Sequence, residues 1–256
     1  MSDLLVLCYH AVSDRWPADL SLSPAALESQ LTLLADRGYE GVTFTDAVLG
    51  ERPDKAVAVT FDDAYRSVLT LGAPVLRRLN WPATVYVPTD YAGTERPMSW
   101  PGIDQWMNGE FEPELVPMSW EELTGLAGEG WEIGSHTCSH PHLTELDEGA
   151  LARELRDSKA VCEARLGLPC ASIAYPYGDH DLRVAAAARE AGYRAAGTLP
   201  SRMDARDPFR WPRVGIYHGD DLRRFKAKVS PLVRGLRASR AWEAADRVRS
   251  RLRARR

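Results

Sequence analysis

Long apolar runs are missing from this chain of 256 residues. No stretch approaches the roughly 20 apolar residues that a helix needs to cross a bilayer, which excludes a membrane-spanning helix within these residues. The first eight residues also lack the basic start and the apolar length of a secretory signal. We therefore expect a cytoplasmic protein.

Cysteines are few, and Cys8, Cys138, Cys162 and Cys170 show no C-x-x-C spacing. In a reducing compartment we expect free thiols, which excludes a fold held together by disulfides. What remains is the composition of an ordinary globular protein, 45% hydrophobic and 27% charged. A chain of this length can bury a large core as one domain.

Charge is unevenly distributed along the chain. Residues 222–256 hold 13 Lys or Arg and two Asp or Glu, so a basic segment follows an acidic body. We divide the chain into a globular domain, residues 1–228, and a basic helical tail, residues 229–256. The tail could lie on anionic lipid as an amphipathic helix, or it could be a solvated terminal helix. Nucleic-acid binding is not expected, since the body is acidic and contains no recognisable module.

Short apolar strands alternate with amphipathic helices in the globular domain. Apolar runs predict strands at 4–9, 42–44, 56–61, 84–87, 132–134, 172–174, 193–197 and 213–216. Capping residues predict helices at 24–37, up to 79, 119–127, 147–166 and 181–191. Strands separated by helices pair in parallel, and seven or eight such units favour an α/β fold closed into a barrel over an open sheet.

Four polar clusters each come directly after one of these strands. They are Tyr9-His10, Asp62-Asp63, the segment from His136 to His140, and the segment from Tyr175 to Gly178. In βα folds the catalytic groups collect where the strands end, at one rim. The four clusters therefore predict a single site, although they are far apart in the sequence.

Asp62 and Asp63 are neighbouring carboxylates at one strand end. Two carboxylates at close range repel, so both stay ionised only with a cation or a proton between them. A metal on one would leave the other free to accept a proton. The alternative is that one carboxylate caps a helix while the other is solvated.

His136 and His140 are four residues apart. On a helical turn their rings would share one face and could reach a single ion. Two histidines with one carboxylate leave open positions for water and substrate, as a catalytic metal site requires. The alternative is two loop histidines bonded to the backbone. His142 is near enough to be a substitute ligand but breaks the spacing.

Three of these clusters carry a resemblance to a known family. Residues 60–63 (TFDD), 135–140 (SHTCSH) and 175–178 (YPYG) resemble the first three motifs of the NodB-type polysaccharide deacetylases, carbohydrate esterase family 4. The resemblance covers about residues 4–225. It implies a distorted (β/α) barrel with about seven strands, and removal of N- or O-linked acetyl groups from glycans.

The resemblance also implies roles for individual residues. Asp62 matches the general base, while Asp63, His136 and His140 match the ligands of a divalent metal, usually Zn²⁺, with Co²⁺, Ni²⁺ or Mn²⁺ as alternatives. The backbone N–H of Tyr177 matches the group that holds the oxyanion. The substrate implied is an acetylated saccharide, or a lipid-linked sugar if the basic tail docks on the inner face of the membrane.

Two departures from the family pattern bear on the site. The third motif lacks the usual Arg-Pro-Pro, as in the branch that includes poly-N-acetylglucosamine deacetylases, and Arg213 is our candidate to orient Asp62 instead; a salt bridge at a surface or strand end is the alternative. The usual last motif is absent from the C-terminus. The strand that ends at His10 has the same form, which is similar to circularly permuted members, and we prefer His10 to His218 as the general acid.

Other functions stay open at this point. The same fold could hydrolyse a non-glycan amide or a formamide, or bind glycans without turnover. Two histidines and a carboxylate also suit a non-haem iron oxygenase, but the alternating βα pattern argues against the all-β fold expected there. Within the long segment 88–118, Trp100 and Trp106, with nearby Trp120, could stack on sugars or pack the insertion onto the barrel.

Overall fold

The computed structural model describes residues 3–200, 203 and 207–239. Its main sheet has the strand order β10-β9-β8-β7-β6-β5-β1-β11, and β4 pairs with β5 off this path. Every strand pair is parallel. The strands are β1 (Asp3–Tyr9), β4 (Glu40–Val42), β5 (Lys55–Phe61), β6 (Thr84–Val87), β7 (Glu132–Ser135), β8 (Ser172–Ala174), β9 (Ala195–Thr198), β10 (Trp211–Pro212) and β11 (Val214–Gly215).

The two ends of this sheet lie next to each other in the chain. Only Arg213 separates β10 from β11, so the sheet nearly closes into a barrel, as the sequence predicts. A separate parallel pair, β2 (Ala11–Val12) and β3 (Ser21–Leu22), follows β1. Tyr9 pairs with Phe61, which brings the ends of β1 and β5, and the residues that follow them, to the same level of the rim.

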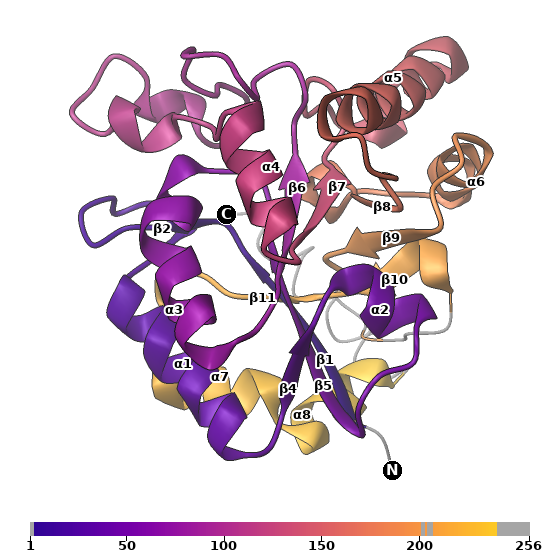
Figure 1. Ribbon diagram of the computed structural model, residues 1–256. Coiled ribbons are helices and arrows are strands. Elements are labelled where there is room, and N and C mark those ends of the chain that lie inside the picture. Colours follow the sequence, from indigo (N-terminus) through magenta and orange to yellow (C-terminus); the bar gives the residue numbers. More distant parts are fainter. Residues whose placement is uncertain (1–2, 201–202, 204–206, 240–256) are drawn as a thin grey trace, which may run out of the picture.

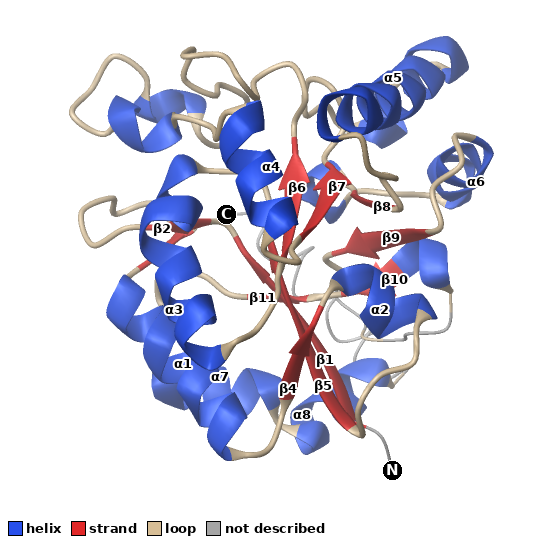
Figure 2. Cartoon of the chain, in the orientation of Figure 1, coloured by secondary structure: helices blue, strands red, loops and turns tan. Residues whose placement is uncertain are grey.

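Helices surround the strands, which occupy the middle of the molecule (Figure 2). The helix bounds are α1 (Pro24–Asp36), α2 (Phe44–Leu49), α3 (Ala73–Leu79), α4 (Trp120–Gly128), α5 (Glu148–Leu166), α6 (Leu182–Glu190), α7 (Leu222–Val229) and α8 (Pro231–Ala238). Helices α1, α3 and α7 gather at one side and α5 and α6 at the other (Figure 1). A π-helical turn (Val68–Gly72) precedes α3.

The predicted helix starts are confirmed by their caps. Ser23 accepts a hydrogen bond from the Ala26 N–H, with Pro24 at the first helical position. Ser119 and Glu122 form the complete capping box of α4. Asp147 caps α5 by accepting from the Ala150 N–H. Local side-chain chemistry therefore sets where these helices begin.

The predicted strand 42–44 is wrong at its end. Strand β4 stops at Val42 because Thr43 caps a short helix, α2, by accepting from the Asp46 N–H. Phe44 at the start of α2 is fully buried and packs with Tyr86, at a ring-centroid distance of 5.9 Å. The Phe44 N–H also donates to Thr84, the first residue of β6. Helix α2 thus closes the amino-terminal end of the barrel, opposite the polar clusters.

The last predicted strand, 213–216, is also interrupted. Arg213 lies between two short strands, β10 and β11, and its N–H donates to the carbonyl of Thr198. The strand predicted at 193–197 begins only at Ala195. Both differences arise where the barrel closes, because pairing with distant strands rather than local pattern decides which residues are extended there.

The start of the predicted basic tail packs against the barrel. Arg234 of α8 donates to the carbonyl of Leu4 and pairs with Asp3 at the start of β1. Residues 240–256 lie outside the described residues, so a boundary at residue 228 stays a prediction. Within the described part of the chain, no helix is both long enough and apolar enough to cross a membrane.

Gly197 in β9 links the packing of the barrel to the site. A Cβ at this position would lie 2.8 Å from Arg213 Nε. We expect Gly197→Ala to lower the free energy of unfolding by about 1–3 kcal/mol through overpacking. Gly125→Ala is the matched control, because a Cβ there meets nothing within 4 Å and alanine favours the helix. Urea denaturation would show the difference, and equal stability of the two variants would contradict it.

Candidate metal centre and active site

Asp63, His136 and His140 come together at the carboxyl-terminal rim of the barrel. Asp63 Oδ1 lies 3.3 Å from His136 Nε2 and 3.4 Å from His140 Nε2. One ligand atom from each residue lies within 4.8 Å of those of the other two, and all three residues are buried. The structure therefore brings together the three predicted ligands from two separate strand ends.

The segment that holds the two histidines is not the helical turn that the sequence predicted. Residues 136–140 form an irregular loop after β7. Thr137 and His140 have left-handed backbones, with φ of 67° and 64°. The Thr137 hydroxyl accepts a hydrogen bond from the His140 N–H, which folds the loop back on itself. The rings still converge, with centroids 4.8 Å apart, because of this loop rather than helical spacing.

The hydrogen bonds around these residues fit a divalent metal ion. His136 Nδ1 is 2.8 Å from the carbonyl of Ala174, so its Nε2 is left facing Asp63. Asp63 Oδ1 is buried without a hydrogen bond among the described residues. A buried carboxylate oxygen in this state calls for a cation. Two imidazoles and one carboxylate are the donor set of a catalytic zinc site.

The two histidines titrate differently. Burial lowers the pKa of His140 to about 3, so its imidazole is neutral and able to act as a ligand. Burial also lowers the pKa of His136, but the Asp62 and Asp63 carboxylates outweigh it and leave the pKa raised. The negative charge of Asp62 and Asp63 thus favours a positive charge at this point, either on the His136 ring or on a bound ion.

Asp62 is held ionised beside this group. Arg213 donates to both of its oxygens, at 2.6 Å and 2.8 Å. Burial raises the pKa of Asp62, but Arg213 and His136 outweigh burial and hold it well below its usual range. Arg213 is only 1% exposed, so it is not a surface ion pair. The structure places it where the sequence analysis put the partner of Asp62.

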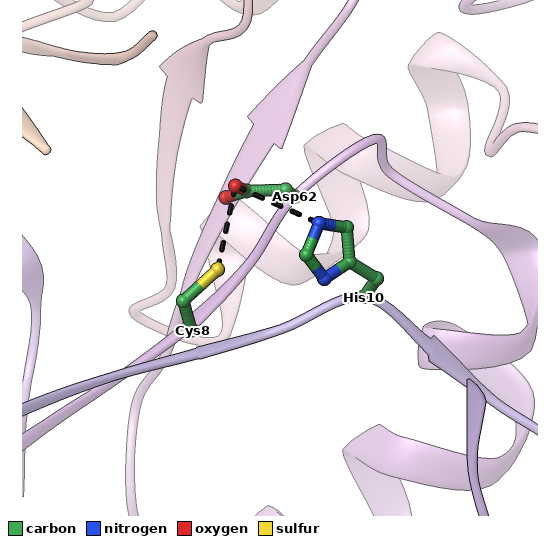
Figure 3. Close-up of side chains that lie close together, drawn as sticks. All are labelled: Cys8, His10 and Asp62. Carbon is green, nitrogen blue, oxygen red and sulfur yellow. Dashed lines mark hydrogen bonds and ion pairs between the residues drawn. The ribbon is translucent and has the colours of Figure 1, made fainter. Parts of the chain in front are cut away.

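Cys8 near the end of β1 and His10, which directly follows this strand, also face the Asp62 carboxylate (Figure 3). Cys8 Sγ donates to Asp62 Oδ2 at 3.4 Å, and His10 Nε2 lies 4.0 Å from the same oxygen. Burial lowers the pKa of His10. The sequence analysis did not single out Cys8, although it lies two residues before His10 and side chains two residues apart along an extended segment point the same way.

Cys8, His10 and Asp62 could in principle form a second metal group. The geometry argues against it, because both Asp62 oxygens already accept from Arg213. The guanidinium would also repel a cation placed there. The adjacent carboxylates thus differ in role: Asp63 faces the imidazoles, and Asp62 stays available to accept a proton.

Tyr177 lies beside the histidines and borders a cavity. Its backbone is left-handed, with φ of 59°, and its ring packs edge-on to His140 at 4.6 Å. The His142 ring stacks on the Tyr177 ring, with the two centroids 4.0 Å apart, and its Nδ1 faces Asp179. His142 therefore supports Tyr177, and it is not a substitute ligand.

The cavity above the site has a volume of about 700 Å³. Of the three tryptophans considered, Trp100 lines it and stacks on His140 at 4.1 Å. Trp106 packs against Trp16 and Phe111, as an insertion does. Tyr217 and the acidic Asp19 and Asp220 also line the cavity, and no sequence motif pointed to them.

These features define a class of protein. The fold is a parallel βα barrel, and its cavity presents an Asp-His-His group beside an ionised carboxylate. This combination is typical of metal-dependent hydrolases built on such barrels. A family model for polysaccharide deacetylases matches residues 49–196. The chain belongs to the polysaccharide deacetylase family. The match contains every predicted metal ligand, whereas His10 and Arg213 lie outside it and join the site through the fold.

Individual relatives agree with this assignment. A Bacillus subtilis (strain 168) protein named for polysaccharide deacetylase activity, YxkH, is 26% identical over 209 residues, 80% of this chain and 67% of that protein. The poly-beta-1,6-N-acetyl-D-glucosamine N-deacetylase of Escherichia coli (strain K12) is 30% identical over 146 residues, 52% of this chain. The chain spans only 20% of that enzyme's length.

Solved structures show the same fold. IcaB from Ammonifex degensii superposes with a TM-score of 0.67 at 25% identity, covering 93% of this chain and 98% of that one. A polysaccharide deacetylase from Bacillus cereus gives 0.71 at 25% identity, covering 90% of this chain and 69% of that one. The nearly closed parallel barrel is therefore the architecture of this family.

The ligand assignment can be tested by metal content. We expect His136→Ala and His140→Ala to bind divalent metal at least about tenfold more weakly, because each removes one of three ligands. Elemental analysis after dialysis measures the content. His142→Ala is the matched control and should keep it. Full metal content in both ligand variants would refute the assignment.

Proposed function

We propose that this chain removes the acetyl group from an N-acetylated sugar, using a divalent ion held by Asp63, His136 and His140. The observation that carries the proposal is the ionised carboxylate of Asp62 beside that ligand group. Hydrolysis of an amide needs both an electrophile for the carbonyl and a base for water. The similarity to the poly-beta-1,6-N-acetyl-D-glucosamine N-deacetylase supports an N-acetylglucosamine polymer as substrate.

Asp62 acts as the general base in this proposal. Its carboxylate has about four lone-pair sites, of which Arg213 uses two and Cys8 one, so one is left to take the proton of the attacking water. Arg213 fixes the direction of the carboxylate. The ion, when bound, supplies a Lewis acid that polarises the acetyl carbonyl and acidifies water.

The other two residues complete the reaction. His10 lies 4.0 Å from Asp62 and borders the cavity. Because burial lowers its pKa, it must first take up a proton, such as the one Asp62 accepts from water, before it protonates the leaving amine as general acid. The Tyr177 backbone N–H is our candidate to hold the oxyanion, since this residue lines the cavity beside His140. Its left-handed backbone sets the direction of that N–H.

Zinc is our proposal for the ion. Imidazole and carboxylate ligands with an open position suit Zn²⁺, and the same donors accept Co²⁺, Ni²⁺ or Mn²⁺. A cytoplasmic location, docking of the basic tail on an anionic membrane, and a lipid-linked sugar as substrate stay predictions from the sequence. No nucleic acid is expected as a partner.

Acetate release tests the proposed function directly. We expect acetate from N-acetylglucosamine oligomers, loss of that activity with a chelator, and recovery with added Zn²⁺. A panel with O-acetylated sugars, formamides and non-glycan amides separates the alternatives. Binding of oligomers without release of acetate in the presence of zinc would show a glycan-binding protein instead.

Asp62→Asn tests the base. Because general-base catalysis contributes about 10²–10⁴-fold, we expect kcat to fall by that factor while zinc content is unchanged. Asp104→Asn, an exposed carboxylate, is the control for the loss of a charge. Near-normal turnover by Asp62→Asn would rule out the assignment.

A further inference from the structure

The loop that carries the two histidine ligands has an unfavourable backbone. Thr137 is β-branched and has φ of 67°, and His140 has φ of 64°. Left-handed conformations are uncommon for such residues and persist only where the surroundings impose them. The loop therefore needs contacts from outside itself to hold the ligands in place before an ion binds.

Glu154 of α5 provides such contacts. Its Oε2 accepts from the Cys138 N–H at 2.7 Å and from the Ser139 N–H at 3.1 Å, and its Oε1 accepts from the Ser139 hydroxyl at 2.7 Å. We call this set the Glu154 clamp. One half-buried carboxylate thus binds both residues at the middle of the loop, directly before His140.

A second connection runs from the next turn of the same helix. Ser158, four residues after Glu154, is fully buried and donates to the Glu154 carbonyl. Its hydroxyl also accepts from the Ser135 hydroxyl at 2.8 Å, and Ser135 in turn accepts from the Thr137 N–H at 3.1 Å. Helix α5 therefore supports the loop at its start and at its middle.

Glu154 does not reach the ligand group itself. Glu154 does not line the cavity, and its carboxylate accepts hydrogen bonds from Cys138 and Ser139 of the loop. It cannot bind the ion or the substrate. Any effect it has on the site must pass through the position of the loop.

We infer that Glu154 is a positioning residue that preorganises the histidine loop and so sets the affinity of the site for its divalent ion. The inference rests on the proposed function, because it assumes that the site binds an ion. Without the clamp, the loop samples other conformations, and the ion must order it on binding. Removal of groups that orient metal ligands weakens binding by about 10–100-fold.

Zinc titration of the full chain against a competing chelator, without substrate, tests this. We expect Glu154→Ala to raise the zinc dissociation constant by about 10–100-fold. Glu154→Gln keeps an acceptor oxygen and should recover part of the loss. Asp157→Asn is the matched control, since it is exposed on the same helix and removes the same charge without a clamp contact.

Two further readouts separate positioning from general damage. In the metal-free protein, hydrogen exchange at the amides of residues 136–140 should be faster in Glu154→Ala, and unchanged in Asp157→Asn. At saturating zinc, the kcat for acetate release should return close to that of the unmodified chain. A merely structural role would leave kcat low at any zinc concentration.

The outcomes are distinct. If the unmodified chain binds zinc, and Glu154→Ala binds it equally with unchanged exchange in the loop, the clamp is refuted and the proposed function stands. A fall in affinity as large in Asp157→Asn would also refute it, because charge alone would then explain the effect. Failure of the unmodified chain to bind any divalent ion would overturn both proposals.

Discussion

Two buried carboxylates on adjacent residues place the strongest constraint on this structure. Asp62 and Asp63 are almost completely excluded from water, and at this range both can be ionised only with positive charge beside each. Arg213 supplies that charge to Asp62, and two imidazoles face Asp63. Removing one partner of a buried ion pair costs about 3–5 kcal/mol. The charges needed at the site are therefore also needed for the fold to be stable.

The topology of the barrel explains how Arg213 reaches Asp62. Arg213 separates β10 from β11, at the point where the two ends of the sheet meet. Strand β1 lies between β5 and β11, so Cys8 in β1 and His10 directly after it approach Asp62 from the neighbouring strand. Strand β1, which His10 follows directly, thus completes the rim at the closure, although it is the first strand of the chain. The strand pairing that closes the sheet therefore also brings Arg213, Cys8 and His10 to Asp62.

Local patterns in the sequence predicted much of this arrangement. Features that depend on contacts between distant segments were not predicted. Apolar runs followed by polar clusters predicted the parallel barrel and the rim that holds Asp63 and His136, because strand ends in such folds share one side. Spacing suggested a helical turn up to His140, but the turn is an irregular loop, since its shape depends on contacts from α5. The support by Glu154 was not visible, because a single glutamate on a helix face carries no local signal.

The division of roles between Asp62 and Asp63 also bears on the choice of reaction. A facial-triad oxygenase uses two histidines and one carboxylate and needs no ionised base beside them. Here a second carboxylate lies 4.0 Å from His136, one of the predicted ligands, and is kept ionised by a bidentate arginine. A buried charge is costly unless it is paired and hydrogen-bonded, and Arg213 does both for Asp62. A proton acceptor next to a Lewis acid is what hydrolysis requires, so the arrangement of charge, more than the ligand set, indicates a hydrolase.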